Sequence, residues 1–324
     1  MSVRLATVVL AVLVMSAGAV ACGDDAGAGP SGTSTETTSP SPTETAGSRP
    51  TEPVSDGPHK ENYVYLLGGS AARESIISHA SWTREIKKLG GGKVRAYDLG
   101  NRVQAFDADV ELVKAMPAGP TLVLIGISVG RFTIMPEELE QQLAEQDASQ
   151  IIAAPPEVIH QYDPSGIHSD SMKVRMLERW LNERASVFQQ NIAFNVAGLE
   201  RLIKICQRRK FEPVLLELPF NADFAGSLDV FGGPRKQYGA QVRKLARRFD
   251  VPYVDFLSEV PLANTDFTDF QHMAVTGRPV WQTRLSQEVV NLLAKQDLAE
   301  GAGALVCGSA PAPSRHPEHK TGQG

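Results

Sequence analysis

The sequence predicts an α/β fold, a three-layer α/β/α sandwich around a central, mostly parallel five-stranded sheet. Short apolar runs alternate along the chain with stretches of helical periodicity, which is the order of a sheet whose strands are joined by helices. The apolar runs are nearly continuous, as expected for strands covered on both faces. This combination is typical of flavodoxin-like domains, whose ligands bind beyond the carboxyl ends of the strands.

Five runs are predicted to be strands, and the gaps between them are predicted to be helical. The strands are 63–67, 94–99, 121–128, 213–218 and 251–256, and the helices are 74–89, 103–116, 187–207, 235–249 and 276–294. The helix 187–207 has the clearest pattern, because apolar side chains recur in it every three or four residues. Cys206 ends this stripe, and a free, buried thiol is expected there; a bridge to Cys307 is the alternative.

Composition divides the 324 residues into four segments. Residues 1–22 have a short positive start and an apolar run, as in a secretory signal. Residues 23–58 are rich in Gly, Ser, Thr and Pro and are predicted to be a disordered tether. Residues 59–298 form the predicted folded domain, and 299–324 a disordered tail.

The end of the signal segment suggests a lipid anchor. The run Ala19-Val20-Ala21-Cys22 resembles the lipobox of bacterial lipoproteins, in which the cysteine carries the lipid, although Ala19 replaces the usual leucine. The alternative is an ordinary cleaved signal, which would release the protein from the cell. In either case we expect an extracytoplasmic protein, lipid-anchored to the cell membrane in the first case and secreted in the second.

Net charge and residue type exclude two classes of partner. The formal charge is -5 and we find no Lys/Arg block, which argues against nucleic acid. His160 and His168 lie in a long connection, 129–171, but no acid or thiol stands at ligand spacing around them, so they are interpreted as exposed loop residues. We expect neither a metal nor another cofactor. The connection itself, which also contains Tyr162, is a candidate lid or substrate wall.

Two motifs carry acid, base and nucleophile chemistry. In Asp269-Phe270-Gln271-His272 the carboxylate stands three residues before the imidazole and can fix its tautomer. Far upstream, Gly68-Gly69-Ser70 follows the first apolar run, at a turn that would expose the serine hydroxyl. A serine needs a base within hydrogen-bond reach before it attacks an ester. The two motifs together therefore predict a serine hydrolase.

The order of these motifs resembles the four blocks of the SGNH (GDSL-like) hydrolases, over about residues 62–296. The blocks are Gly68-Gly69-Ser70, Gly100, Gly126-Ile127-Ser128 and Asp269-x-x-His272. The resemblance implies that Ser70 is the nucleophile, His272 the base and Asp269 the acid that orients it. It also implies that backbone N–H groups of Ser70 and Gly100 bind the oxyanion.

Ser128 departs from the family pattern, because an asparagine is usual there as a third oxyanion donor. A serine hydroxyl can donate but is shorter, so Asn101 or Arg131 are candidates to reach the substrate instead. The function expected is hydrolysis of carboxylic esters, with O-acetyl or other O-acyl groups on glycans as substrates. Two alternatives stay open: an O-acyltransferase with the same residues, and an inactive domain that binds a glycan or a partner.

Overall fold

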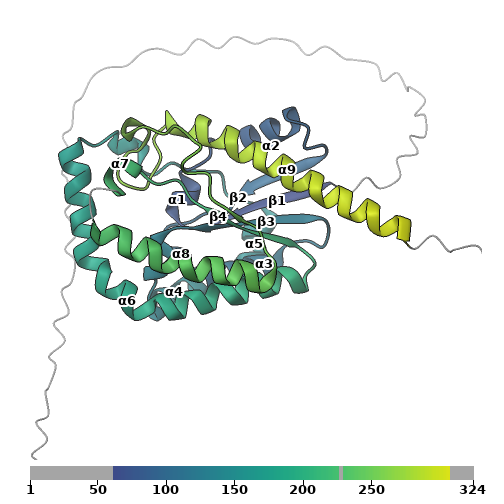
Figure 1. Ribbon diagram of the computed structural model, residues 1–324, viewed down its shortest axis with the longest axis horizontal. Helices are drawn as coiled ribbons and strands as arrows, with labels where there is room; N and C mark the ends of the chain where they lie inside the picture. Colours follow the sequence, from purple (N-terminus) through teal and green to yellow (C-terminus); the bar gives the residue numbers. More distant parts are fainter. Residues whose placement is uncertain (1–60, 226–228, 307–324) are drawn as a thin grey trace, which may run out of the picture. The chain divides into compact units, whose positions relative to one another are not determined.

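Five strands form one sheet in the order β2-β1-β3-β4-β5, and every neighbouring pair is parallel (Figure 1). They are β1 (Asn62–Leu67), β2 (Val94–Asp98), β3 (Thr121–Ile127), β4 (Glu212–Glu217) and β5 (Tyr253–Val254). The structure, a computed structural model, describes residues 61–225 and 229–306. The predicted fold class is confirmed, and all five carboxyl ends lie along one edge of the sheet.

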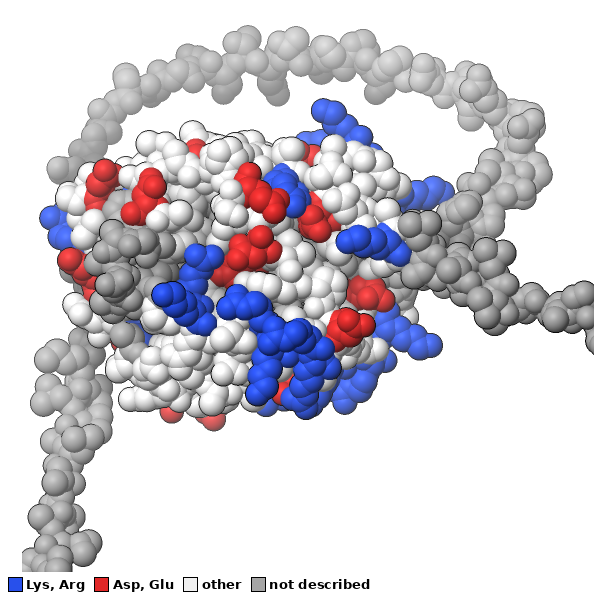
Figure 2. Space-filling view, in the orientation of Figure 1, with Lys and Arg blue, Asp and Glu red and all other residues white. Residues whose placement is uncertain are grey.

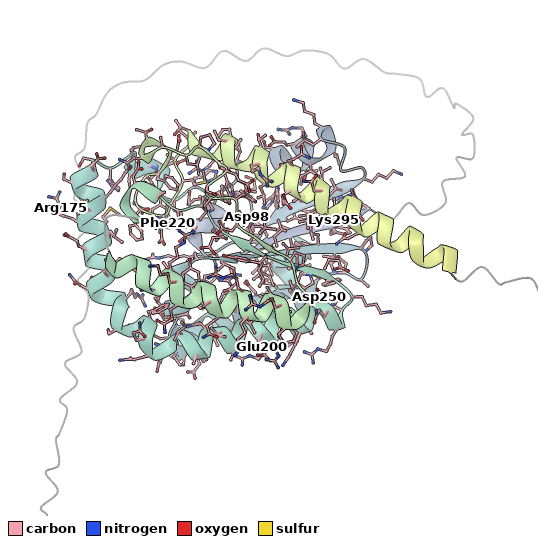
Figure 3. The ribbon with its side chains drawn as sticks, viewed as in Figure 1. Asp98, Arg175, Glu200, Phe220, Asp250 and Lys295 are labelled. Atoms are coloured by element: carbon pink, nitrogen blue, oxygen red, sulfur yellow. The ribbon has the colours of Figure 1, made fainter. Side chains whose placement is uncertain are left out.

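Helices cover both faces of this sheet. Over one face lie α3 (Phe106–Ala115), α6 (Asp170–Arg208) and α8 (Asp229–Phe249), and over the other α1 (Ser70–Arg73), α2 (His79–Lys88) and α9 (Gly277–Val306) (Figure 1). The remaining short helices are α4 (Pro136–Glu145), α5 (Ala148–Ala153) and α7 (Ala222–Ala225). The turn that precedes β5 and the loop that follows β4 lie at opposite ends of the domain, as the labels Asp250 and Phe220 show (Figure 3).

The two faces separate because side chains alternate along a strand. Leu67 and Ile125 pack with α3, α6 and α8, whereas their neighbours Leu66 and Leu124 pack on the opposite side with α2 and α9. All seven residues of β3 are buried, which explains why its sequence is apolar throughout. Cys206 lies in the first of these cores as a free thiol, as predicted, and burial raises its pKa to about 12. Cys307 lies outside the described residues.

Several predicted boundaries differ from the structure. The predicted helix 74–89 begins only at His79, because Ser78 caps it by accepting a hydrogen bond from the Ser81 N–H. The predicted helix 187–207 begins seventeen residues earlier, at Asp170, and the connection before it contains α4 and α5. α9 continues to Val306, into the segment predicted to be a tail. The predicted signal and the whole predicted tether lie outside the described residues, as does 307–324.

The surface carries charges of both signs. Figure 2 shows Asp and Glu interspersed with Lys and Arg on the face in view. Among the described helices, none combines the length and the apolar character that a bilayer span requires.

Candidate active site

The predicted nucleophile lies at the point where the strand order reverses. The chain passes from β1 to β2 in one direction and then returns to β3 on the other side of β1. Ser70 follows β1 and Ser128 follows β3, so the two residues flank the crevice that forms at such a switch point.

Close backbone packing sets the position of Ser70. A Cβ on Gly68 would lie 2.7 Å from the Cβ of Ala72, and one on Gly126 would lie 2.9 Å from the Leu67 carbonyl oxygen. Both positions therefore require glycine for the turn to pass so close to its neighbours. Ser70 begins α1, and the N–H of a first helical residue has no partner within its own helix.

The Asp269 carboxylate closes a tight turn around His272. Its Oδ1 accepts hydrogen bonds from the backbone N–H groups of Gln271 and His272, both at 2.8 Å. The His272 carbonyl in turn accepts from the Thr268 N–H at 2.8 Å. The ring is thus held by local backbone contacts in a turn that is not helical, although the three-residue spacing alone allows a helix.

Ser70, His272 and Asp269 come together as one chain of hydrogen bonds. Ser70 Oγ lies 2.8 Å from His272 Nε2, and His272 Nδ1 lies 2.7 Å from Asp269 Oδ2. Because a carboxylate only accepts, Nδ1 carries the proton and Nε2 accepts from the serine hydroxyl. Burial by itself would raise the pKa of Asp269, but the His272 ring and the two backbone donors outweigh it and hold that pKa below its ordinary value. Asp269 is therefore ionised at neutral pH.

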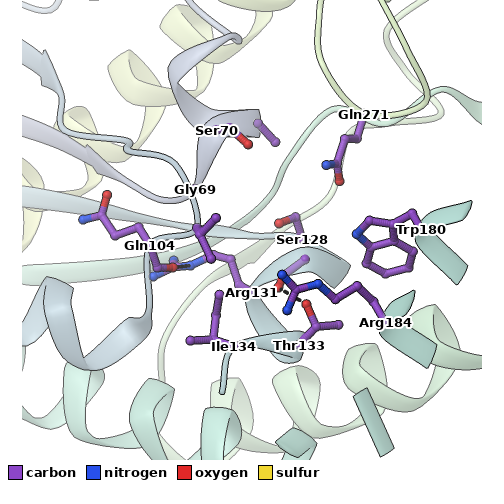
Figure 4. Close-up of a pocket in the computed structure, with 13 residues that line it drawn as sticks. Gly69, Ser70, Gln104, Ser128, Arg131, Thr133, Ile134, Trp180, Arg184 and Gln271 are labelled. Atoms are coloured by element: carbon purple, nitrogen blue, oxygen red, sulfur yellow. Dashed lines mark hydrogen bonds between the residues drawn. The ribbon is translucent and has the colours of Figure 1, made fainter. Parts of the chain in front are cut away.

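One of the predicted oxyanion donors has a hydrogen-bond partner within the protein. Gly100 N–H donates to Asp98 Oδ1 at 2.7 Å, and a Cβ at Gly100 would lie 2.8 Å from the Arg73 nitrogen. The glycine permits close approach to α1, and its role as an oxyanion donor stays a prediction. Ser128 does line the same cavity as Ser70 (Figure 4).

The two predicted substrate-binding residues have other roles. Asn101 is exposed, lines a different cavity beside Asp98, and its Oδ1 accepts from the Arg102 N–H at 2.7 Å. The Arg131 guanidinium is buried, pairs with Asp109, donates to two carbonyl oxygens and lies 3.8 Å from the Phe106 ring centre. Arg131 also lines the cavity beside Ser70, and the idea that it reaches substrate stays a prediction.

A cavity of about 100 Å³ lies beside Ser70 (Figure 4). Trp180 and Arg184, one turn apart on α6, form one wall, and Gln271 from the histidine turn forms another. The sequence motifs do not identify these three residues. Val103 also lines the cavity with φ of 54°, a conformation costly for a β-branched residue and one found at functional sites.

The long insertion contributes a residue directly over the base. The Tyr162 ring stacks on the His272 ring with 3.6 Å between ring centres and 12° between planes. The expectation that the insertion forms a wall of the site agrees with this contact. Sequence periodicity could not predict the contact between Tyr162 and His272, because Tyr162 lies in irregular chain before α6.

Buried charges hold this part of the insertion. Glu74, fully buried, accepts from Arg278 Nη2 at 2.9 Å and lies 3.2 Å from His160 Nδ1, and Arg278 also binds Asp163 at 2.6 Å. Arg73 Nη2 also lies 3.4 Å from Glu74 Oε1. His160 is therefore not the exposed loop residue that the sequence suggested. Within the described ranges, no three His, Cys, Asp or Glu side chains gather in a way that could hold a metal ion.

Asp98, at the end of β2, is a buried acid near this network (Figure 3). Its Oδ2 makes no hydrogen bond among the described residues, and burial raises its pKa to about 7 from an ordinary value of 3.8. The folded state then holds a proton that the unfolded state releases between these pH values. This contribution to the free energy of unfolding is present below about pH 4 and is lost as the pH rises through 7.

Asp98→Asn is therefore expected to stabilise the protein at alkaline pH. The amide keeps an acceptor for the Gly100 N–H and removes the buried charge, a gain on the order of 3 kcal/mol at pH 8 that fades toward pH 4. Thermal unfolding at several pH values measures it. Asp107→Asn, whose carboxylate pairs with Arg201 at 2.6 Å, should show no such gain. An equal gain at pH 4 and pH 8 would contradict a buried charge as its cause.

Comparisons with known proteins reveal similarity of fold at low identity. No family model and no curated protein matches this sequence. A member of the lipolytic protein G-D-S-L family from Veillonella parvula matches at 10% identity and a TM-score of 0.41, over 70% of this chain and 97% of its own. The chain is similar in fold to GDSL-type hydrolases.

Two named esterases match in the same way. One is an acetylxylan esterase from Geobacillus stearothermophilus, at 12% identity and a TM-score of 0.41, over 70% of this chain and 93% of its own. The other is a carbohydrate acetylesterase family member from Sinorhizobium meliloti, at 13% identity and a TM-score of 0.38, over 72% and 98%. At such identities a match describes the fold, so the function has to come from the geometry around Ser70.

Proposed function

We propose that this protein is a serine esterase that cleaves small acyl esters through an acyl-enzyme on Ser70. The observation that carries the proposal is the hydrogen-bond chain from Ser70 Oγ to His272 Nε2 at 2.8 Å and from His272 Nδ1 to Asp269 Oδ2 at 2.7 Å. A nucleophile, a base and a group that orients the base are the parts that acyl transfer needs. A domain that only binds ligand would have no use for this alignment.

The reaction follows from the protonation states. His272 Nε2 takes the Ser70 hydroxyl proton as Oγ attacks the ester carbon, and the ionised Asp269 stabilises the imidazolium that forms. The imidazolium then gives its proton to the departing alcohol. A water molecule repeats both steps and releases the acid.

The shape and lining of the cavity support short acyl groups on glycans, acetyl above all. A volume of about 100 Å³ is well below that of typical drug-sized pockets, which favours a short acyl group over a long chain. Trp180 offers a flat apolar face with a polar edge, and Arg184 and Gln271 offer donors to hydroxyl and carbonyl oxygens. Together these groups suit a sugar that presents both apolar faces and hydroxyls.

The location we propose is outside the cytoplasm, with a lipid anchor at Cys22 and glycans of the cell envelope as substrates. It is supported by the signal-like start, the lipobox resemblance and the tether-like composition of 23–58. Membrane fractionation of cells that make the full chain tests it; protein found wholly in the cytoplasmic fraction would contradict it.

The activity is tested by labelling the purified protein with a fluorophosphonate and by assaying hydrolysis of an aryl acetate and an acetylated oligosaccharide. We expect the probe on Ser70, and we expect Ser70→Ala and His272→Ala to lose labelling and turnover. Ser128→Ala is the matched serine control and should still be labelled. Activity that survives Ser70→Ala would rule out this function, and product analysis with a glycan acceptor separates hydrolysis from acyl transfer.

A further inference from the structure

The Tyr162 side chain lies over the proposed base, and the proposed function gives its hydroxyl no role. Its ring covers one face of His272, with 3.6 Å between ring centres. An interaction of its hydroxyl with the Ser70 side chain opposes the rise that burial causes in the pKa of Tyr162. A phenol O–H is both donor and acceptor, whereas the ring of a phenylalanine would give the same stacking without either. The hydroxyl therefore has a separate role to explain.

Residues on both sides of Tyr162 are anchored to buried partners. Gln161 N–H donates to Glu74 Oε1 at 3.0 Å, and the Gln161 side chain accepts from Arg73 Nη2 at 3.0 Å. Asp163 binds Arg278 through both carboxylate oxygens, at 2.6 and 2.7 Å. These contacts hold the phenol in place before substrate arrives. A donor held in advance stabilises developing charge without reorganising, which makes it effective in catalysis.

The oxyanion site needs such a donor. Gly100 N–H is occupied by Asp98 Oδ1 at 2.7 Å. The position where the SGNH pattern has asparagine is Ser128, whose hydroxyl is short and rotates. Of the oxyanion donors that the motifs predict, the Ser70 N–H and the Ser128 hydroxyl remain to bind the oxyanion.

We propose that the Tyr162 hydroxyl donates a hydrogen bond to the oxyanion of the tetrahedral intermediate, which makes Tyr162 a catalytic residue; this rests on the esterase function proposed above. As Ser70 Oγ bonds to the ester carbon, its proton moves to His272 Nε2 and the carbonyl π electrons move onto the oxygen. That oxygen is two bonds from Oγ, so a donor near Oγ needs only a small shift to reach it. The phenol keeps its own proton throughout.

When the tetrahedral intermediate collapses, the oxyanion disappears and the Tyr162 hydroxyl loses this acceptor. The C=O bond re-forms, the bond to the leaving alcohol breaks, and the alcohol takes the proton from His272. Burial raises the pKa of Tyr162 and outweighs the opposing effects of Ser70, Arg102 and Arg73, so the phenol is protonated at neutral pH and available to donate. Deacylation by water passes through a second oxyanion at the same position.

The test is Tyr162→Phe, which keeps the stacked ring and removes one oxygen. We expect kcat for an aryl acetate to fall about 10²-fold with KM within about threefold, the usual cost of one oxyanion donor. The inhibition constant of an aryl trifluoromethyl ketone, which forms a hemiketal oxyanion on Ser70, should rise by the same factor. Tyr63→Phe, a tyrosine of β1 whose ring stacks on Tyr65, is the matched control and should match wild type.

The outcomes separate this proposal from the esterase function. If wild type is active, Ser70→Ala is inactive, and Tyr162→Phe keeps wild-type kcat, the oxyanion role of Tyr162 is wrong while the esterase stands. A fall in kcat with an unchanged ketone inhibition constant would also overturn it, because a purely structural effect does not track oxyanion binding. If Ser70→Ala retains full activity, the esterase function itself fails.

Discussion

Asp269→Asn is expected to lower kcat about 10⁴-fold while the fold stays intact. The amide oxygen can replace Oδ1 as acceptor of the Gln271 and His272 N–H groups, both at 2.8 Å. The amide nitrogen then faces His272 Nδ1 as a donor. That contact favours the tautomer with the proton on Nε2, which cannot accept the proton of Ser70. Steady-state kinetics with an aryl acetate measure the loss.

Asp266→Asn is the matched control for this change. Asp266 lies in the same loop and also accepts from a backbone N–H, that of Ala263 at 2.8 Å, but it does not contact His272. We expect near wild-type kcat in this variant. Near wild-type kcat in Asp269→Asn would show that the carboxylate does not set the tautomer of the base.

Arg278→Met is expected to lower the free energy of unfolding by about 3–5 kcal/mol. Arg278 is 2% exposed and binds Glu74 and Asp163, and the loss of its charge leaves the fully buried Glu74 without its closest cation. The same contacts hold the Tyr162 segment, so kcat should fall as well. Urea unfolding monitored by circular dichroism gives the free energy.

Two further variants make this result specific. Arg284→Met, on the same helix, removes a partly exposed cation that pairs with Glu259 and Glu288, and should cost about 1 kcal/mol or less. Adding Glu74→Gln to Arg278→Met removes the unpaired charge, so the double variant should be less destabilised than the two single losses added together. Equal costs for Arg278→Met and Arg284→Met would contradict a stabilising buried network.

Local sequence determined the sheet and the catalytic motifs of this protein. The apolar runs predicted all five strands. The reason is clearest in β3, which is buried along its whole length, because a strand covered on both faces must be apolar. Gly68-Gly69-Ser70 and Asp269-x-x-His272 are short motifs whose geometry depends on neighbouring residues. Parallel strand ends meet at one edge of a sheet, so the distance of 2.8 Å between Ser70 and His272 agrees with the order of the motifs.

Only the tertiary structure decided which donors surround Ser70. Gly100 matches a motif, yet its N–H donates a hydrogen bond to Asp98. The Arg131 guanidinium forms an ion pair with Asp109. Tyr162 matches no motif and lies in irregular chain, where no period predicts the direction of a side chain. Its place over His272 depends on contacts of the insertion with Glu74 and Arg278, which are distant in sequence. Long-range contacts of this kind form only when the chain folds, so a motif could predict the nucleophile and base but not the full set of groups around them.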